Sequence, residues 1–89
     1  MSPDERELPA IDFSTFILSL STSGLYQLGL VSGPDGDKID LPDRALARQT
    51  IDTLEMLQRK TRGNLDEEEM KLFESLLYEL RMRFVSQGE

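Results

Sequence analysis

Apolar residues in the final third of the chain recur at steps of three and four positions. They are Met70, Phe73, Leu77, Leu80 and Phe84. This spacing places them on one face of an α-helix, in the pattern that lets a helix pack lengthwise against a partner. Asp66 and Glu69 precede the run at the separation of a capping box, in which each side chain accepts a hydrogen bond from the other residue's backbone N–H. The sequence therefore predicts a helix over residues 67–85.

A second helix is predicted over residues 41–61 from the same kind of pattern. Its apolar face consists of Ala47, Ile51 and Leu54, with Leu46 and Leu57 alongside. We expect Asp40 to cap its N-terminus, Pro42 to stand in its first turn and Asp43 to act as the acid of a capping box. Gly63 supplies the residue of positive φ that commonly follows a helix.

The short connection around Gly63 and Asn64 predicts that the second and third helices form an antiparallel hairpin. Charged pairs one helical turn apart, with the acid on the N-terminal side, mark the solvated faces of this hairpin. The pairs are Glu55 with Arg59, Glu67 with Lys71, and Glu79 with Arg83. The basic cluster of Arg59, Lys60 and Arg62 is explained by the helix dipole, which favours cations at a C-terminus.

Between Phe13 and Pro34 the chain carries no charged residue. Many positions there are Ser, Thr, Gly or Gln, so the stretch lacks the predominantly apolar run of a bilayer span. We predict instead a first helix over residues 13–29, capped by Asp12 or Ser14. Its apolar face consists of Phe13, Phe16, Ile17, Leu20, Gly24 and Leu28. A half-buried strand is the competing interpretation, because an alternation also runs through Phe16, Leu18, Leu20 and Thr22.

These elements predict an all-α fold of three helices, in which the first helix packs across the hairpin. Residues 11–87 are expected to form a single helical domain, and residues 1–10, which are polar and contain two prolines, a flexible N-terminal segment. The first residues are acidic where a secretory signal would carry basic ones, so we expect a cytoplasmic protein. A chain of 89 residues offers few elements to cover the uncharged helix. We therefore expect a dimer to complete the core.

The composition argues against several classes of function. The chain has no histidine and no cysteine, so it lacks the commonest metal ligand, a neutral-pH proton shuttle and a thiol nucleophile. Its net charge of −7 argues against a surface that neutralises nucleic-acid phosphates. No two acidic residues fall on an otherwise apolar face that would raise a pKa for proton transfer. We therefore expect no enzyme activity, no cofactor, no nucleic-acid partner and no stable membrane insertion.

The acidic loop over residues 35–43 is the sharpest local candidate for a metal site, because it resembles the latter part of a calcium-binding EF-hand loop. It departs from that pattern, since Gly33 stands where a leading acid belongs and Asp43 stands where a bidentate glutamate is needed. Turn residues followed by a helix cap account for the same residues. We assign no metal ligand here, and divalent-metal or small-molecule binding by this loop stays as the alternative function.

The uncharged first helix is the expected contact surface. Its small residues Ser19, Ser21, Ser23, Gly24 and Gly29 either permit close approach of another helix or simply face water. We predict a small non-enzymatic interaction module that self-associates as a homodimer and binds a further protein partner of unknown identity. The residues expected to form its interaction surface are Phe16, Leu18, Leu25 and Tyr26.

Several stretches in the same order resemble a small bacterial family catalogued as domain of unknown function 1844. They are residues 12–20, 49–57, 60–65 and 76–84. The resemblance extends from Pro9 to Ser86, and the acidic loop lies outside the matching stretches. It implies a stand-alone bacterial cytoplasmic protein of this length, and it brings no activity, cofactor or catalytic residue to carry over.

Overall fold

A computed structural model describes residues 8, 10–33 and 35–88 of the chain. In that part the chain forms three α-helices and no strand, which confirms the predicted all-α class. The helices are α1 (Phe13–Gln27), α2 (Arg44–Lys60) and α3 (Glu67–Gly88). Most of the N-terminal segment predicted to be flexible lies outside the described residues, and that prediction stays untested.

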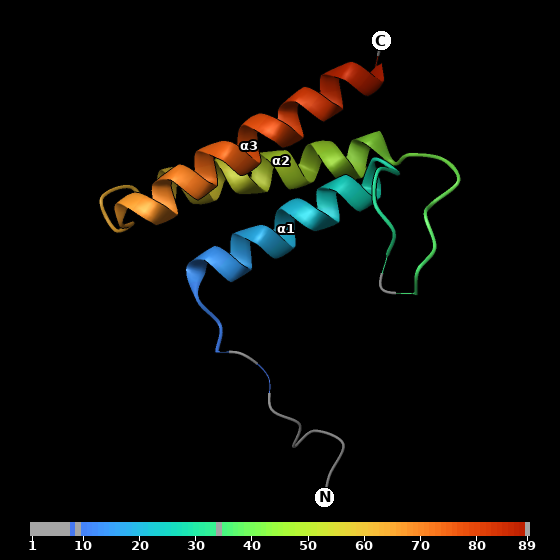
Figure 1. Cartoon of the computed structure of the whole chain (residues 1–89). Helices are drawn as coiled ribbons and strands as arrows, with labels where there is room; N and C mark the ends of the chain where they lie inside the picture. The colour runs from blue at the N-terminus through green and yellow to red at the C-terminus, as the bar shows by residue number, and fades with distance from the viewer. Residues whose placement is uncertain (1–7, 9, 34, 89) are drawn as a thin grey trace, which may run out of the picture.

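Each helix packs against both of the others. In Figure 1 the chain runs along α1, returns beside it along α2, and reverses again into α3. Two polar contacts fix how the ends meet. Arg44 Nη1 donates to the carbonyl oxygen of Phe84 at 2.8 Å, so the start of α2 lies beside the last turns of α3. Thr50 Oγ1 lies 2.7 Å from Gln27 Oε1, which joins α2 to the end of α1.

Helix α1 begins and ends at signals that are local in the sequence. Asp12, one of the two predicted caps, accepts a hydrogen bond from the Thr15 backbone N–H at 2.7 Å. At the other end the N–H of Leu30 donates to Leu25 O and the N–H of Gly29 to Tyr26 O, and Gly29 has φ +75°. These bonds form a Schellman motif, and they end the helix at Gln27, slightly before the predicted boundary.

Helix α2 begins at Arg44, and its N-cap is Asp43. The prediction that Asp40 caps this helix is therefore wrong. Asp43 Oδ1 accepts from the Leu46 backbone N–H at 3.0 Å, while the Asp43 N–H donates to Gln27 O at 2.8 Å. The second bond attaches the start of α2 to the end of α1, and this tertiary contact selects Asp43 as the cap.

The predicted capping box of α3 is confirmed. Glu69 N–H donates to Asp66 Oδ1 at 2.7 Å, and Asp66 N–H donates to Glu69 Oε1 at 2.9 Å. The helix continues to Gly88, beyond the predicted end at residue 85. Its final turns are held by contacts with other elements, since Gln87 Nε2 donates to Leu28 O at 2.6 Å and Arg44 binds the Phe84 carbonyl.

The core lies where the three helices meet. Its buried apolar residues are Ile17, Leu28, Ala47, Ile51, Leu54, Phe73, Leu77 and Leu80. All eight stand on the faces predicted from the sequence. Phe16 and Met70 were expected on those faces, but their side chains are 44% and 46% exposed. Ser21 is buried in α1 at 4% exposure, because its small side chain fits the line along which α1 meets the other helices.

Candidate functional site

The four residues predicted to form the interaction surface all belong to α1, but they do not share a face. Successive residues of a helix are turned by about 100°, so Phe16 and Leu18 point about 200° apart. Both are exposed, at 44% and 49%. Leu25 is half-buried and packs against the core. Tyr26 lies so close to Gly33 that a side chain at the glycine would meet its ring.

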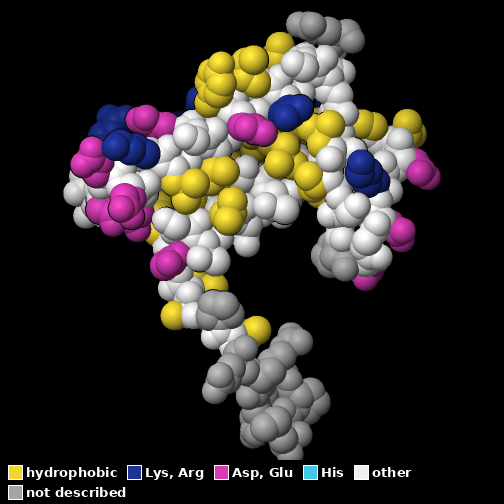
Figure 2. Space-filling view, in the orientation of Figure 1, with side chains coloured by type: hydrophobic (Ala, Val, Ile, Leu, Met, Phe, Trp, Pro, Cys, Tyr) yellow, Lys and Arg dark blue, Asp and Glu magenta, His cyan; other side chains and the backbone are white. Residues whose placement is uncertain are grey.

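A more exposed apolar set lies on the outer side of α3. We call Tyr78, Met82 and Val85 the α3 stripe; their side chains are 67%, 50% and 58% exposed. The spacing of four and three residues puts them on one side of the helix. That side points away from the buried Leu77 and Leu80. Figure 2 shows hydrophobic side chains gathered along the upper edge of the molecule, over α3.

Ion pairs made within the chain border the α3 stripe on both sides. Toward α2, Arg81 Nη2 lies 2.6 Å from Glu55 Oε2, and on the other flank Arg83 Nη2 lies 3.6 Å from Glu79 Oε1. The predicted pairs of Glu79 with Arg83 and of Glu67 with Lys71 are confirmed, while Glu55 pairs with Arg81 instead of Arg59. The stripe is therefore an apolar strip whose neighbouring charges are already balanced.

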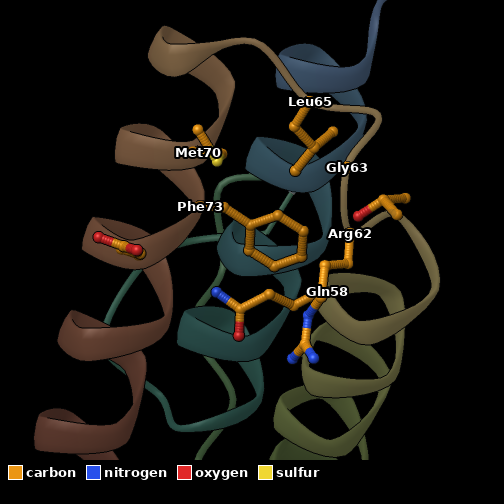
Figure 3. Close-up of a pocket in the computed structure, with 8 residues that line it drawn as sticks. Gln58, Arg62, Gly63, Leu65, Met70 and Phe73 are labelled. Atoms are coloured by element: carbon orange, nitrogen blue, oxygen red, sulfur yellow. The ribbon is translucent and has the colours of Figure 1, made fainter.

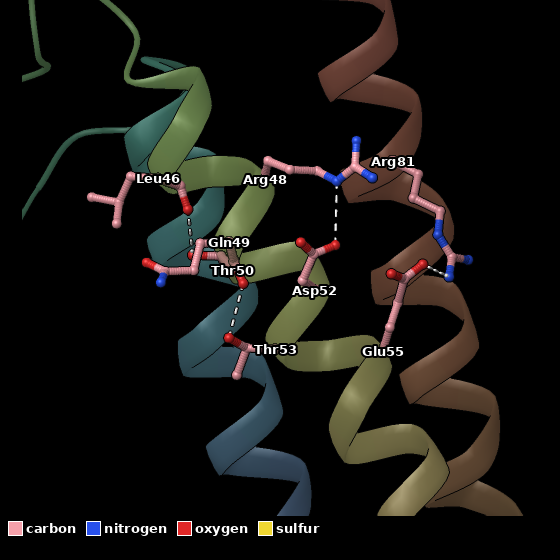
Figure 4. Close-up of polar contacts among 8 residues, drawn as sticks. All are labelled: Leu46, Arg48, Gln49, Thr50, Asp52, Thr53, Glu55 and Arg81. Atoms are coloured by element: carbon pink, nitrogen blue, oxygen red, sulfur yellow. Dashed lines mark hydrogen bonds and ion pairs between the residues drawn. The ribbon is translucent and has the colours of Figure 1, made fainter.

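A groove of about 280 Å³ runs beside the α3 stripe, between α2 and α3. It is lined by Arg48, Ile51, Glu55, Arg81, Phe84 and Val85. Figure 4 shows part of its rim, where Arg48 Nε binds Asp52 Oδ1 at 3.2 Å and Arg81 reaches across to Glu55. The groove therefore has an apolar interior and a rim of paired charges. Val85 belongs both to this groove and to the stripe.

A second cavity, of about 340 Å³, lies at the turn between α2 and α3. Figure 3 shows Phe73 in its middle, with Leu65 and Met70 toward one side and Gln58 and Arg62 toward the other. Thr61, Gly63 and Glu74 complete the lining, so a guanidinium and a carboxylate stand around one apolar floor. This mixture of charges selects no single class of charged ligand.

The acidic loop does not assemble into a site in the described residues. Asp43 caps α2, and within the described part of the chain no three His, Cys, Asp or Glu side chains gather as a metal would require.

Arg59 and Lys60 lie in the last turn of α2, where the dipole interpretation places them. Among the described helices, none combines the length and the apolar character needed to cross a bilayer.

The fold and this surface define a small all-α protein in which three helices pack around one core and leave an apolar strip on the third. Over residues 10–86 the sequence matches the family model described as Domain of unknown function (DUF1844), so the chain belongs to that family and the resemblance drawn from its sequence is confirmed. Comparison with curated proteins and with solved structures gave no match.

Proposed function

We propose that this protein is a non-enzymatic, cytoplasmic bacterial protein that functions as a self-associating interaction module. Two copies form a homodimer through the α3 stripe, and in each copy α2 and α3 act as an antiparallel hairpin with α1 packed across it. The observation that carries the proposal is the exposure of Tyr78, Met82 and Val85 on one side of a helix whose other side is the core. A contiguous apolar surface of this kind is typical of a protein contact site.

The size of the stripe sets the strength expected of the contact. Full burial of a large apolar side chain contributes about 1.5–3 kcal/mol, and association must overcome a loss of translational and rotational freedom that is larger than any one of these contributions. Three side chains per copy therefore support a weak dimer. We expect the fraction of dimer to rise with protein concentration across the micromolar range.

The first helix offers the competing surface, which its lack of charged residues predicts. Leu18 on α1 is 49% exposed and Met82 on α3 is 50% exposed, so replacing either by glutamate introduces a charge at nearly the same degree of exposure. The two variants therefore test the two surfaces, while their expected effects on the free energy of unfolding of a single copy are similar. Neither side chain belongs to the fully buried core.

The test is the molar mass by light scattering over a concentration series, for wild type, Met82→Glu and Leu18→Glu, with helix content checked by circular dichroism. The proposal expects a mass that approaches two copies in wild type and in Leu18→Glu, and a single copy in Met82→Glu at every concentration. A wild-type protein that stays monomeric would refute self-association. A dimer lost only in Leu18→Glu would transfer the contact surface to α1.

A further inference from the structure

We infer that the two copies pack antiparallel through α3, with Met82 at the two-fold axis and Tyr78 of each copy seated in the groove beside Val85 of the other. This inference rests on the proposed function and specifies the arrangement of the same surface. It follows from the order of the stripe residues along the helix, from the groove next to Val85 and from the balanced charges around both.

The stripe is nearly symmetric about Met82. Tyr78 lies one turn before Met82 and Val85 lies just under one turn after it, at a separation of seven residues along α3. In an antiparallel contact with Met82 on the axis, Tyr78 of one copy therefore faces Val85 of the other, and the same contact is made twice. In a parallel contact each stripe residue would instead face the same residue of the other copy, so that Tyr78 would face Tyr78.

In this arrangement the groove accommodates Tyr78 of the other copy. Val85 stands at its edge, and Ile51 and Phe84 give it an apolar interior, within a volume of about 280 Å³. The ring of Tyr78 is the most exposed side chain of the stripe, at 67%. A tyrosine that enters an apolar pocket and keeps its hydroxyl at the rim is a frequent centre of interface affinity. Arg48 at this rim provides N–H donors for that hydroxyl.

Charge favours a second copy over a charged partner as the occupant. Arg81 is held by Glu55 and Arg83 by Glu79, so the charges that flank Met82 and Val85 are paired within the chain and attract neither an acidic nor a basic segment. The chain as a whole carries −7, yet its last α3 turns hold Arg81 and Arg83 against Glu79. The charges closest to Met82 and Val85 therefore add little repulsion between two acidic copies.

Single cysteines test the arrangement, because the chain has none of its own. Met82→Cys, Tyr78→Cys, Val85→Cys and the control Leu18→Cys are each oxidised mildly, and a tagged Tyr78→Cys is also oxidised together with Val85→Cys. A disulfide forms readily only where the two Cα atoms come within about 7 Å. We expect Met82→Cys to cross-link with itself, and Tyr78→Cys to cross-link with Val85→Cys far faster than either does alone.

A second measurement uses substitutions that keep the helix. Tyr78→Ala is expected to raise the dimer dissociation constant at least tenfold, whereas Tyr78→Phe, which keeps the ring, is expected to change it less than threefold. Self-cross-linking at Tyr78, Met82 and Val85 alike would show a parallel dimer and overturn the inference, while the proposed function would stand. Cross-linking at Leu18 alone would overturn both the inference and the α3 surface, and a monomeric wild type would refute self-association itself.

Discussion

The guanidinium carbon of Arg44 lies 3.9 Å from the centroid of the Phe84 ring, and the same side chain donates from Nη1 to the Phe84 carbonyl oxygen at 2.8 Å. One residue at the start of α2 thus makes a cation–π contact and a hydrogen bond with one residue near the end of α3. Phe84 stands four residues before the last residue of α3, so Arg44 joins the start of α2 to the last turns of α3 through both a carbonyl group and an aromatic ring.

We expect Arg44→Ala to lower the free energy of unfolding by about 1–2 kcal/mol, since it removes both contacts at a half-buried position. Arg44→Lys should recover only part of the loss, because a lysine lacks the planar fork that stacks and donates at once. Urea denaturation followed by circular dichroism measures both. Lys71→Ala is the control, as its exposed pair with Glu67 is expected to contribute less than about 0.5 kcal/mol. Equal losses in the two alanine variants would contradict the special role of Arg44.

An added methyl group at Gly24 is predicted to destabilise the fold. A Cβ at this position would lie 2.9 Å from Leu80 Cδ2 and 3.3 Å from Thr50 Cγ2. Leu80 is fully buried, so its δ-methyl groups would have to shift within a packed core, and overpacking is expected to cost about 1–3 kcal/mol. The helix propensity of alanine offsets about 1 kcal/mol of that cost, which leaves Gly24→Ala destabilised by about 1 kcal/mol.

Thermal unfolding measures the Gly24→Ala effect. Ser23→Ala is the control, because Ser23 is exposed in the same helix and the substitution changes propensity without crowding a neighbour. We expect Ser23→Ala to leave the midpoint unchanged or to raise it slightly. A Gly24→Ala variant with a higher midpoint than wild type would show that the helices move apart at little cost.

The contribution of the α3 capping box to the free energy of unfolding should be measurable by removing one of its residues. Asp66→Ala is expected to destabilise the protein by about 1 kcal/mol, since the Glu69 N–H then loses its acceptor. Glu68→Ala keeps both bonds of the box and removes only an acid near the helix N-terminus, so a smaller loss is expected. Chemical denaturation of the two variants and of wild type provides the comparison. A Glu68→Ala loss as large as that of Asp66→Ala would assign the stabilisation to charge instead of to the cap.

The cap of α1 predicts that the free energy of unfolding depends on pH. Hydrogen bonds from the side chain and the backbone of Thr15 lower the pKa of Asp12 below its ordinary value. A carboxyl whose pKa is lower in the folded state stabilises the fold at every pH above its unfolded value, and that contribution is lost as the pH falls through the folded value. Asp12→Asn still caps but does not titrate. The stability advantage of wild type over Asp12→Asn should therefore shrink as the pH is lowered from 5 to 2.5, and a constant difference would exclude the titration of Asp12 as the cause.

Features whose partners lie within one helical turn of each other were predictable from the sequence. The Asp66–Glu69 box, the Asp12 cap and the positive φ of Gly63 after α2 are of this kind, and the structure shows all of them. The start of α2 was not predictable in the same way, because Asp40 and Asp43 are both good caps. The choice between them is made by the bond from the Asp43 N–H to Gln27 O, which joins segments far apart in the chain.

The candidate surface was missed for a related reason. Leu77 and Leu80 follow the three-and-four spacing on one side of α3, and Tyr78, Met82 and Val85 follow it on the other. The spacing alone does not tell which apolar face a neighbouring helix covers. The exposed residues of α1 are predicted as the interaction surface because no charged residue lies near them in the sequence. The α3 stripe lies among charges whose pairing is visible only in three dimensions.

The close contact at Gly24 also determines how the molecule opens. Gly24 of α1 lies against Thr50 of α2 and Leu80 of α3. Separation of any one helix from the bundle therefore exposes residues of the other two at this point. The bundle should consequently behave as a single cooperative folding unit. In native-state hydrogen exchange, the most protected amides of all three helices would then report one common opening free energy, equal to that of global unfolding.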